Sequence, residues 1–153
     1  NLLKAWKAAD TSFPFVDSHA KTYSVRDGSD WEQTLKPRLH ARLNASANVV
    51  LFLSSNTRYS RALREEIDYA INTKELPIIV VYPELKTMDD IHTQSEFTST
   101  VTKLWDKLPM FRDNKYKVPV LHVPNNKVLI TKALNDTDLR VSTKTKAGDY
   151  YFQ

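Results

Sequence analysis

The stretch from residue 48 to residue 83 reads as a complete β-α-β unit, which restricts the fold more than any other part of the chain. Residues 48–53 carry one apolar run, and residues 76–83 carry a second that ends at a proline. Such runs are typical of strands buried on both faces of a parallel sheet. The apolar residues between them recur at helical spacing: Leu63, Ile67, Ala70 and Ile71. Because ligands bind beyond the carboxyl ends of parallel strands, we expect functional residues near 54–58.

The composition excludes several kinds of protein. A length of 153 residues predicts a single domain, 1–153, with a sizeable core. The only glycines, Gly28 and Gly148, cannot form a glycine-rich dinucleotide fingerprint or a phosphate loop. The chain has no cysteine, which excludes thiolate nucleophiles and cysteine-bound zinc, and its histidines lack metal-ligand spacing. No apolar run approaches the roughly 20 residues of a membrane span, so we predict a cytoplasmic protein without a membrane partner.

The charge pattern points to no nucleic-acid partner. The net charge is +4, and the basic residues are spread along the chain instead of forming a tail. A solvated basic face explains this mild bias, although it would also favour a small anionic ligand or an acidic partner surface.

The segment before the β-α-β unit also alternates between predicted helices and strands. We expect the end of a helix at residues 2–9, a short strand at 13–16 and a polar loop at 18–29, long enough to be functional. Residues 29–32, Ser-Asp-Trp-Glu, match a capping box that opens a helix carrying Leu35, Leu39 and Leu43 at i, i+4 spacing. Pro37 predicts either a kink or a new helix start there. Since the chain opens with a helix, we also expect a first strand upstream of Asn1 to be missing from this sequence.

The segment after the unit continues the alternation. A helix carries an apolar stripe and ends at Pro109: Phe97, Val101, Leu104, Trp105 and Leu108. Residues 116–124 form a strand whose prolines favour a short or edge position, and we expect His122 within it to be a hydrogen-bonded core histidine.

Asn125 or Asn126 caps a last helix, and residues 150–152 can pair at a sheet edge. The alternation predicts an α/β fold: a doubly wound, mostly parallel sheet in three α/β/α layers with flavodoxin-like order.

Several of these segments together resemble the TIR-like family of bacterial antiphage proteins, the TIR-like subunit of Thoeris systems and its relatives. They are residues 15–18 (Phe-Val-Asp-Ser), the leucine helix, residues 49–57 (Val-Val-Leu-Phe-Leu-Ser-Ser-Asn-Thr) and residues 62–70 (Ala-Leu-Arg-Glu-Glu-Ile-Asp-Tyr-Ala). The likeness covers roughly residues 13–82. It implies a flavodoxin-like fold and consumption of NAD⁺ as substrate, by hydrolysis or cyclisation of ADP-ribose, with no metal and no further cofactor.

The resemblance places the catalytic glutamate at one of two positions. Glu66, in the sequence Arg-Glu-Glu-Ile, matches the Thoeris-type pattern, whereas the eukaryotic TIR pattern points to Glu32 beside Trp31. The ordinary alternatives are a solvated helix residue for Glu66 and a capping-box residue for Glu32. A carboxylate in either place would stabilise the positively charged ribose that forms when the nicotinamide bond breaks.

Six further residues are candidates for binding the substrate: Asp17, Ser18, Trp31, Ser54, Asn56 and Arg58. Most follow strand ends, so we expect Asp17, Ser18, Trp31, Ser54, Asn56 and Glu66 to face one cleft. Each also has a structural explanation: a turn for the Asp-Ser pair, core packing for Trp31, helix capping for the residues at 54–57 and a solvated face for the arginines.

Three functions remain open at this point. The first is a TIR-like enzyme that consumes NAD⁺ in immune signalling, with a homo-oligomer or an effector protein of the same defence system as partner. The second is a TIR-like module that only binds partners. The third, a receiver-like domain, is disfavoured because only Asp17 suits a phosphoacceptor and residues 123–125 offer no lysine after the strand.

Overall fold

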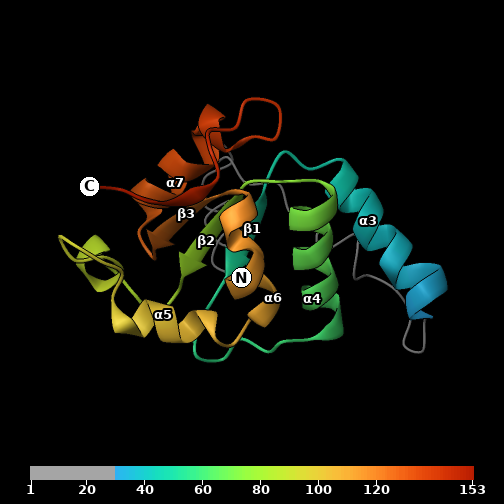
Figure 1. Ribbon diagram of the computed structural model, residues 1–153, viewed down its shortest axis with the longest axis horizontal. Coiled ribbons are helices and arrows are strands. Elements are labelled where there is room, and N and C mark those ends of the chain that lie inside the picture. Colours follow the sequence, from blue (N-terminus) through green and yellow to red (C-terminus); the bar gives the residue numbers. More distant parts are fainter. Residues whose placement is uncertain (1–29) are drawn as a thin grey trace.

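The computed structural model describes residues 30–153, and in this part of the chain four parallel strands form one sheet in the order β1-β2-β3-β4. The strands are β1 (Val49–Phe52), β2 (Ile78–Tyr82), β3 (Pro119–Pro124) and β4 (Gly148–Tyr151). Neighbours in the sequence are therefore neighbours in the sheet, with helices between them (Figure 1). The predicted α/β fold with a parallel sheet is confirmed.

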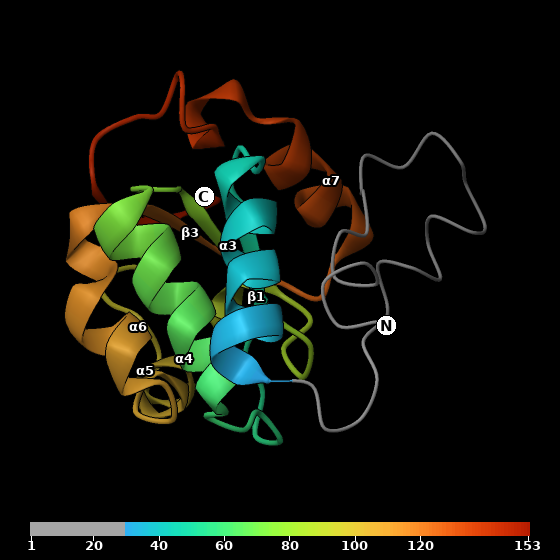
Figure 2. The same cartoon turned by 90° about the vertical axis from the view of Figure 1, so that its right-hand side faces the viewer.

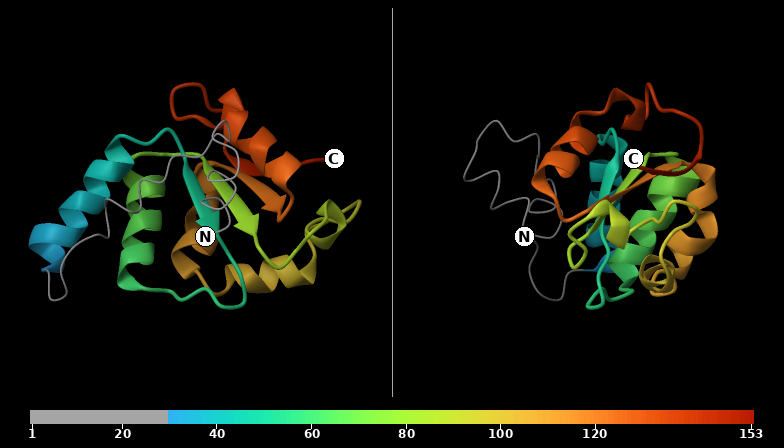
Figure 3. Two further views of the ribbon diagram at one scale, coloured as in Figure 1. Left: turned by 180° about the vertical axis from the view of Figure 1, so that it is seen from behind. Right: turned by 90° about the vertical axis from the view of Figure 1, so that its left-hand side faces the viewer.

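The β-α-β unit that anchors the prediction is present. β1 pairs in parallel with β2, with Val49 opposite Ile78, and the two strands lie side by side in the view from behind (Figure 3). Every residue of β2 is buried, as expected for a strand covered on both faces. β4 forms one edge of the described sheet and pairs in parallel with β3, which confirms the predicted edge pairing of Tyr150 and Tyr151.

The expectation that β3 is short or at an edge is wrong. This strand lies between β2 and β4, and all six of its residues are buried. Its prolines are tolerated because Pro119 is the first and Pro124 the last residue of the strand. Neither proline removes a donor from the middle of the ladder, which is where the loss would be costly.

Helices cover both faces of the sheet. On one face α4 (Arg61–Asp68), α5 (Ser99–Trp105) and α6 (Pro109–Asn114) pack on Leu51, Ile78 and Val80. On the other face α7 (Lys127–Asn135) packs on Ile79 and Val81. Successive side chains of β2 point to opposite faces of the sheet, so this strand contributes buried residues to the core on each face.

One of these helices ends earlier than predicted, and for another the structure selects one of the two predicted caps. The helix expected to end at Pro109 is shorter than predicted: α5 ends at Trp105, and Pro109 instead starts α6, a short helix that the sequence pattern did not reveal. For α7 the cap is Asn126, whose side chain accepts a hydrogen bond from the Leu129 amide at 3.1 Å. α4 continues into a π-helical turn at Tyr69–Thr73.

α3 (Lys36–Asn44) lies alongside α4 (Figure 2), and Leu39 and Leu43 bury its apolar face against Val49. A π-helical turn, Trp31–Leu35, precedes it, and Pro37 stands at the second position of α3. The missing proline amide therefore falls in a first turn, where it is tolerated. This matches the second alternative, a new helix start at Pro37.

The N-cap of the π-helical turn Trp31–Leu35, where the helical segment begins, is Asp30 and not the expected Ser29. The Asp30 carboxylate accepts hydrogen bonds from the amides of Glu32 at 2.8 Å and Gln33 at 3.4 Å. Glu32 is thus the second residue of the helix and its side chain is not needed for a capping box. The expected helix at 2–9, strand at 13–16 and loop at 18–29 lie outside the described residues, as do Asp17 and Ser18.

Short 3-10 turns complete the described chain at Met88–Asp90, Lys115–Lys117 and Thr137–Leu139. In the described part, no helix combines the length and apolar character needed to cross a membrane.

Candidate functional site

Three connections follow the carboxyl ends of β1, β2 and β3, and because the strands are parallel they lie at one edge of the sheet. They are the β1–α4 loop (residues 54–60), the turn at 83–85 after β2, and Asn125 after β3. This edge is where a ligand is expected in such a sheet.

The β1–α4 loop is folded by its own polar residues. The Ser54 amide donates to the Thr57 hydroxyl at 2.9 Å, and the Asn56 amide donates to the Ser54 hydroxyl at 3.2 Å. The cap of α4 is a different residue, Ser60, whose hydroxyl accepts from the Leu63 amide at 3.1 Å. The loop therefore leaves the exposed side chains of Asn56 and Arg58 at the sheet edge.

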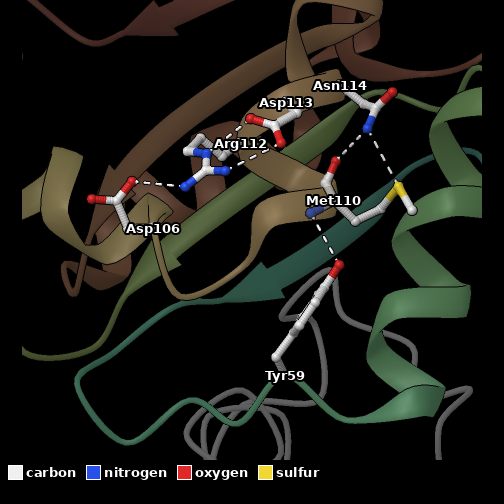
Figure 4. Close-up of polar contacts among 6 residues, drawn as sticks. All are labelled: Tyr59, Asp106, Met110, Arg112, Asp113 and Asn114. Atoms are coloured by element: carbon white, nitrogen blue, oxygen red, sulfur yellow. Dashed lines mark hydrogen bonds and ion pairs between the residues drawn. The ribbon is translucent and has the colours of Figure 1, made fainter.

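Two contacts tie this loop to the rest of the molecule. At its start, the Glu84 carboxylate accepts hydrogen bonds from the Ser55 amide, at 2.7 Å, and from the Ser55 hydroxyl. At its end, the Tyr59 hydroxyl accepts from the Met110 amide in the first turn of α6, at 3.1 Å (Figure 4). The loop is thus held from both sides before any ligand binds.

α6 is itself joined to the end of α5 through Arg112. Its guanidinium donates to Asp106 at 3.1 Å and to Asp113 at 2.8 Å (Figure 4). These groups are exposed, so their direct contribution to stability is small. Their effect is to orient α6, where Tyr59 is anchored.

Glu66 is buried between α3 and α4. The residue is only 4% exposed, and its carboxylate lies 2.9 Å from the guanidinium of Arg42 on α3. Its neighbour Glu65 lies 2.9 Å from His40, whose ring stacks on Tyr69 with centroids 3.8 Å apart. Because a buried carboxylate needs a partner, the contact with Arg42 explains how Glu66 is accommodated at this position.

A third group lies where the π-helical turn Trp31–Leu35 and α4 begin, and it consists of Trp31, Glu32 and Arg61. The Arg61 guanidinium lies 4.9 Å from the centroid of the Trp31 ring and 3.4 Å from the Glu32 carboxylate. Glu32 also lies 3.7 Å from Lys36, one helical turn on. This cluster is accessible: the side chains of Glu32 and Arg61 are 62% and 60% exposed.

The structure thus places the described candidates in three groups. Trp31 and Glu32 meet at the helix ends, Ser54 and Asn56 share the β1–α4 loop with Arg58, and Glu66 pairs with Arg42. Sequence reasoning missed Arg42 and Glu84. Glu84 had a signal, since it follows a buried strand by two residues, whereas the Arg42 contact depends on how two helices pack.

A second polar cluster links β2, β3 and β4 and is separate from these groups; its members Tyr82 and His122 are fully buried. Trp105 donates to the Tyr82 hydroxyl at 2.8 Å, and Tyr82 lies 2.7 Å from Nδ1 of His122. Nε2 of His122 lies 2.8 Å from Asp149, which also accepts from Lys115 at 2.5 Å. The expectation that His122 is a hydrogen-bonded core histidine is confirmed.

Burial and hydrogen bonds shift the pKa values of three groups in this cluster, and burial dominates for His122 and Tyr82. Burial lowers the pKa of His122, and the hydrogen bond to Asp149 does not fully offset this. It raises the pKa of Tyr82, which stays a neutral hydroxyl. Burial also raises the pKa of Asp149, but hydrogen bonds from His122 and Lys115 and the nearby charges outweigh it and leave that pKa below its usual value.

The family comparison agrees with this architecture. The family described as Thoeris protein ThsB, TIR-like domain, matches residues 1–88. The chain belongs to this family. The ThsB TIR-like match includes β1, α4, β2 and both candidate glutamates, and it indicates a role in antiphage defence signalling. Within residues 30–153 no group of three histidine, aspartate or glutamate side chains is arranged to hold a metal ion.

Proposed function

We propose that this ThsB TIR-like protein consumes NAD⁺, breaking the bond between nicotinamide and ribose by hydrolysis or cyclisation, to produce a signal in antiphage defence. The observation that carries the proposal is Glu66. It is a buried carboxylate with a fixed cationic partner, Arg42, on the helix that begins after the β1–α4 loop. Burial and the contact with Arg42 fix the position of the Glu66 carboxylate.

The chemistry needs such a charge. As the glycosidic bond breaks, nicotinamide leaves as a neutral molecule and positive charge develops on the ribose. A carboxylate stabilises that charge most strongly where water is excluded, because the effective dielectric constant is low there. In the proposed arrangement Glu66 faces the ribose, and Arg42 fixes the orientation of its carboxylate.

Other candidates would bind the rest of the substrate. The Trp31 ring offers a face for stacking on a base, and Arg58 offers a cation for the phosphates. Ser54 and Asn56 would contact the ribose hydroxyls, and we keep Asp17 and Ser18, outside the described residues, as further ribose ligands. Glu32 is the alternative catalytic carboxylate because it is accessible beside Trp31.

The first experiment compares two adjacent substitutions. Glu66→Gln keeps the size of the side chain but removes its charge, and we expect nicotinamide release to fall about 10²–10³-fold. Glu65→Gln is the matched control on the same helix and should retain activity. If instead Glu32→Gln abolishes release while Glu66→Gln does not, the catalytic carboxylate is Glu32.

A second experiment separates catalysis from a purely structural role of the ion pair. Replacing Arg42 and Glu66 together by methionine removes both buried charges, and such exchanges are often neutral or stabilising. We expect this double variant to fold and to remain inactive. Recovery of activity together with the fold would show that Glu66 serves only to join α3 and α4.

A non-catalytic interaction module is the competing proposal, and one observation favours it. Arg61 lies over the Trp31 ring and beside Glu32, so the accessible candidates already satisfy one another. In that case a homo-oligomer or an effector protein of the same defence system is the ligand. Absence of nicotinamide release by the wild-type protein, measured with its activating partner present, would decide for this alternative.

A further inference from the structure

The ends of β1, β2 and β3 are joined by a continuous set of hydrogen bonds centred on Glu84. Both oxygens of its carboxylate are engaged by a single residue of the β1–α4 loop, Ser55, through the amide and the hydroxyl. Two donors on one residue fix an orientation as well as a distance. An exposed glutamate on a loop is ordinarily solvated, so this bidentate contact is a specific feature of the edge.

The backbone that carries Glu84 is fixed too. The Leu85 amide donates to the Tyr82 carbonyl at 3.1 Å, which closes the turn at 83–85. From the end of β3, Asn125 donates its side-chain amide to the Pro83 carbonyl at 3.0 Å and its backbone amide to the Leu85 carbonyl at 2.6 Å. Pro83 adds its restricted backbone. The turn that carries Glu84 is therefore held by hydrogen bonds to the ends of β2 and β3.

The hydrogen bonds from the Ser55 hydroxyl and amide lower the pKa of Glu84, so the carboxylate is ionised at neutral pH. A charged acceptor makes stronger hydrogen bonds than a neutral one. The loop that it holds contains Ser54, Asn56 and Arg58, the residues proposed to bind the ribose and phosphates.

We propose that Glu84 is a positioning residue that holds the β1–α4 loop, residues 54–60, in its substrate-binding conformation. This inference rests on the proposed function, because its purpose is to lower the cost of ordering the loop when NAD⁺ binds. Glu84 acts through Ser55 and touches no substrate. Its loss should weaken substrate binding and leave the bond-breaking step, which depends on another carboxylate, almost unchanged.

The test uses Glu84→Ala, with Asp89→Ala as control because it removes one exposed carboxylate from the same connection. Hydrogen bonds to charged groups typically contribute enough to change an equilibrium about tenfold. We expect Glu84→Ala to raise KM for NAD⁺ about tenfold with kcat within about twofold, and Asp89→Ala to match the wild type. Glu84→Gln keeps one acceptor and should recover part of the loss.

The partner variant tests whether Glu84 acts through Ser55. Ser55→Ala should raise KM in the same direction, and the double variant should lose less than the sum of the two single effects. Additive losses, or a fall in kcat with KM unchanged, would overturn the positioning role.

A further readout does not depend on turnover. Amide hydrogen exchange in a peptide covering residues 53–60 should be faster in Glu84→Ala and unchanged in Asp89→Ala. Equal exchange in Glu84→Ala and wild type would overturn the inference even if the enzyme is active. Wild-type protein that releases no nicotinamide while Glu84→Ala loosens the loop would instead refute the enzymatic proposal and support Glu84 as the holder of the loop.

Discussion

At the scale of single residues, both ring nitrogens of His122 have a hydrogen-bond partner: the Tyr82 hydroxyl at Nδ1 and the Asp149 carboxylate at Nε2. The distances fit one directional chain: Trp105 donates to Tyr82, Tyr82 donates to Nδ1 of His122, and Nε2 donates to Asp149. A neutral imidazole satisfies this chain. A second ring proton would sit on Nδ1, which could then no longer accept the hydrogen bond from the Tyr82 hydroxyl. The network therefore specifies one protonation state.

This arrangement predicts a loss of stability in acid. The pKa of His122 is lowered on folding, so below the ordinary histidine pKa of about 6.5 the unfolded chain takes up a proton that the folded chain does not. The free energy of unfolding should fall by up to about 1.4 kcal/mol per pH unit there, until the folded pKa is reached. Lys115 and His92 oppose protonation of His122 as well, whereas Asp149 favours it.

Urea unfolding between pH 8 and pH 5.5 measures this effect. In His122→Gln the amide oxygen can accept from Tyr82 and the amide nitrogen can donate to Asp149, so the network is kept without a titrating group. We expect the pH dependence to be much reduced in that variant. An identical pH dependence in His122→Gln and wild type would assign it to other groups.

At the scale of elements, sequence patterns predicted most strands and helices but misjudged how prolines and helix ends are used. Apolar runs are sufficient to locate β1 and β2, because both strands are buried. The position of β3 in the sheet was missed because a proline is harmful only where a ladder amide is needed, and that depends on its neighbours. The contact between Arg42 and Glu66 depends on the rotation of two helices about their axes, which periodicity alone does not give.

The packing of α3 provides a prediction at this scale. Leu39 is fully buried in the cluster that α3 forms with Val49, Ala70 and Leu76, whereas its neighbour Arg38 is exposed. Leu39→Ala should lower the free energy of unfolding by about 2–5 kcal/mol, because it removes buried methyl groups and leaves a cavity. Arg38→Ala, one position away, should change it by no more than about 0.5 kcal/mol. Denaturant titration of both variants measures the difference.

At the scale of the whole molecule, the described sheet carries a core on each face, and β2 and β3 contribute to both. A single domain spanning 1–153 remains a prediction. It implies one cooperative unfolding transition. Because β2 and β3 belong to the cores on both faces, unfolding of one core would remove the strands on which the other core packs. Near- and far-ultraviolet circular dichroism should then report the same midpoint, and two separated transitions would contradict a single domain.

The strand order has a consequence for how the chain acquires its structure during synthesis. Each strand from β1 to β4 pairs beside the one made just before it, so the sheet can form in the order in which its strands are synthesised. The polar interior is the exception. His122 is made well before Asp149, the acceptor of its Nε2 proton, so a nascent chain that has β3 but not β4 carries an unfinished polar group in its core. The hydrogen-bond network of His122 is therefore complete only once β4 has been made and has paired with β3.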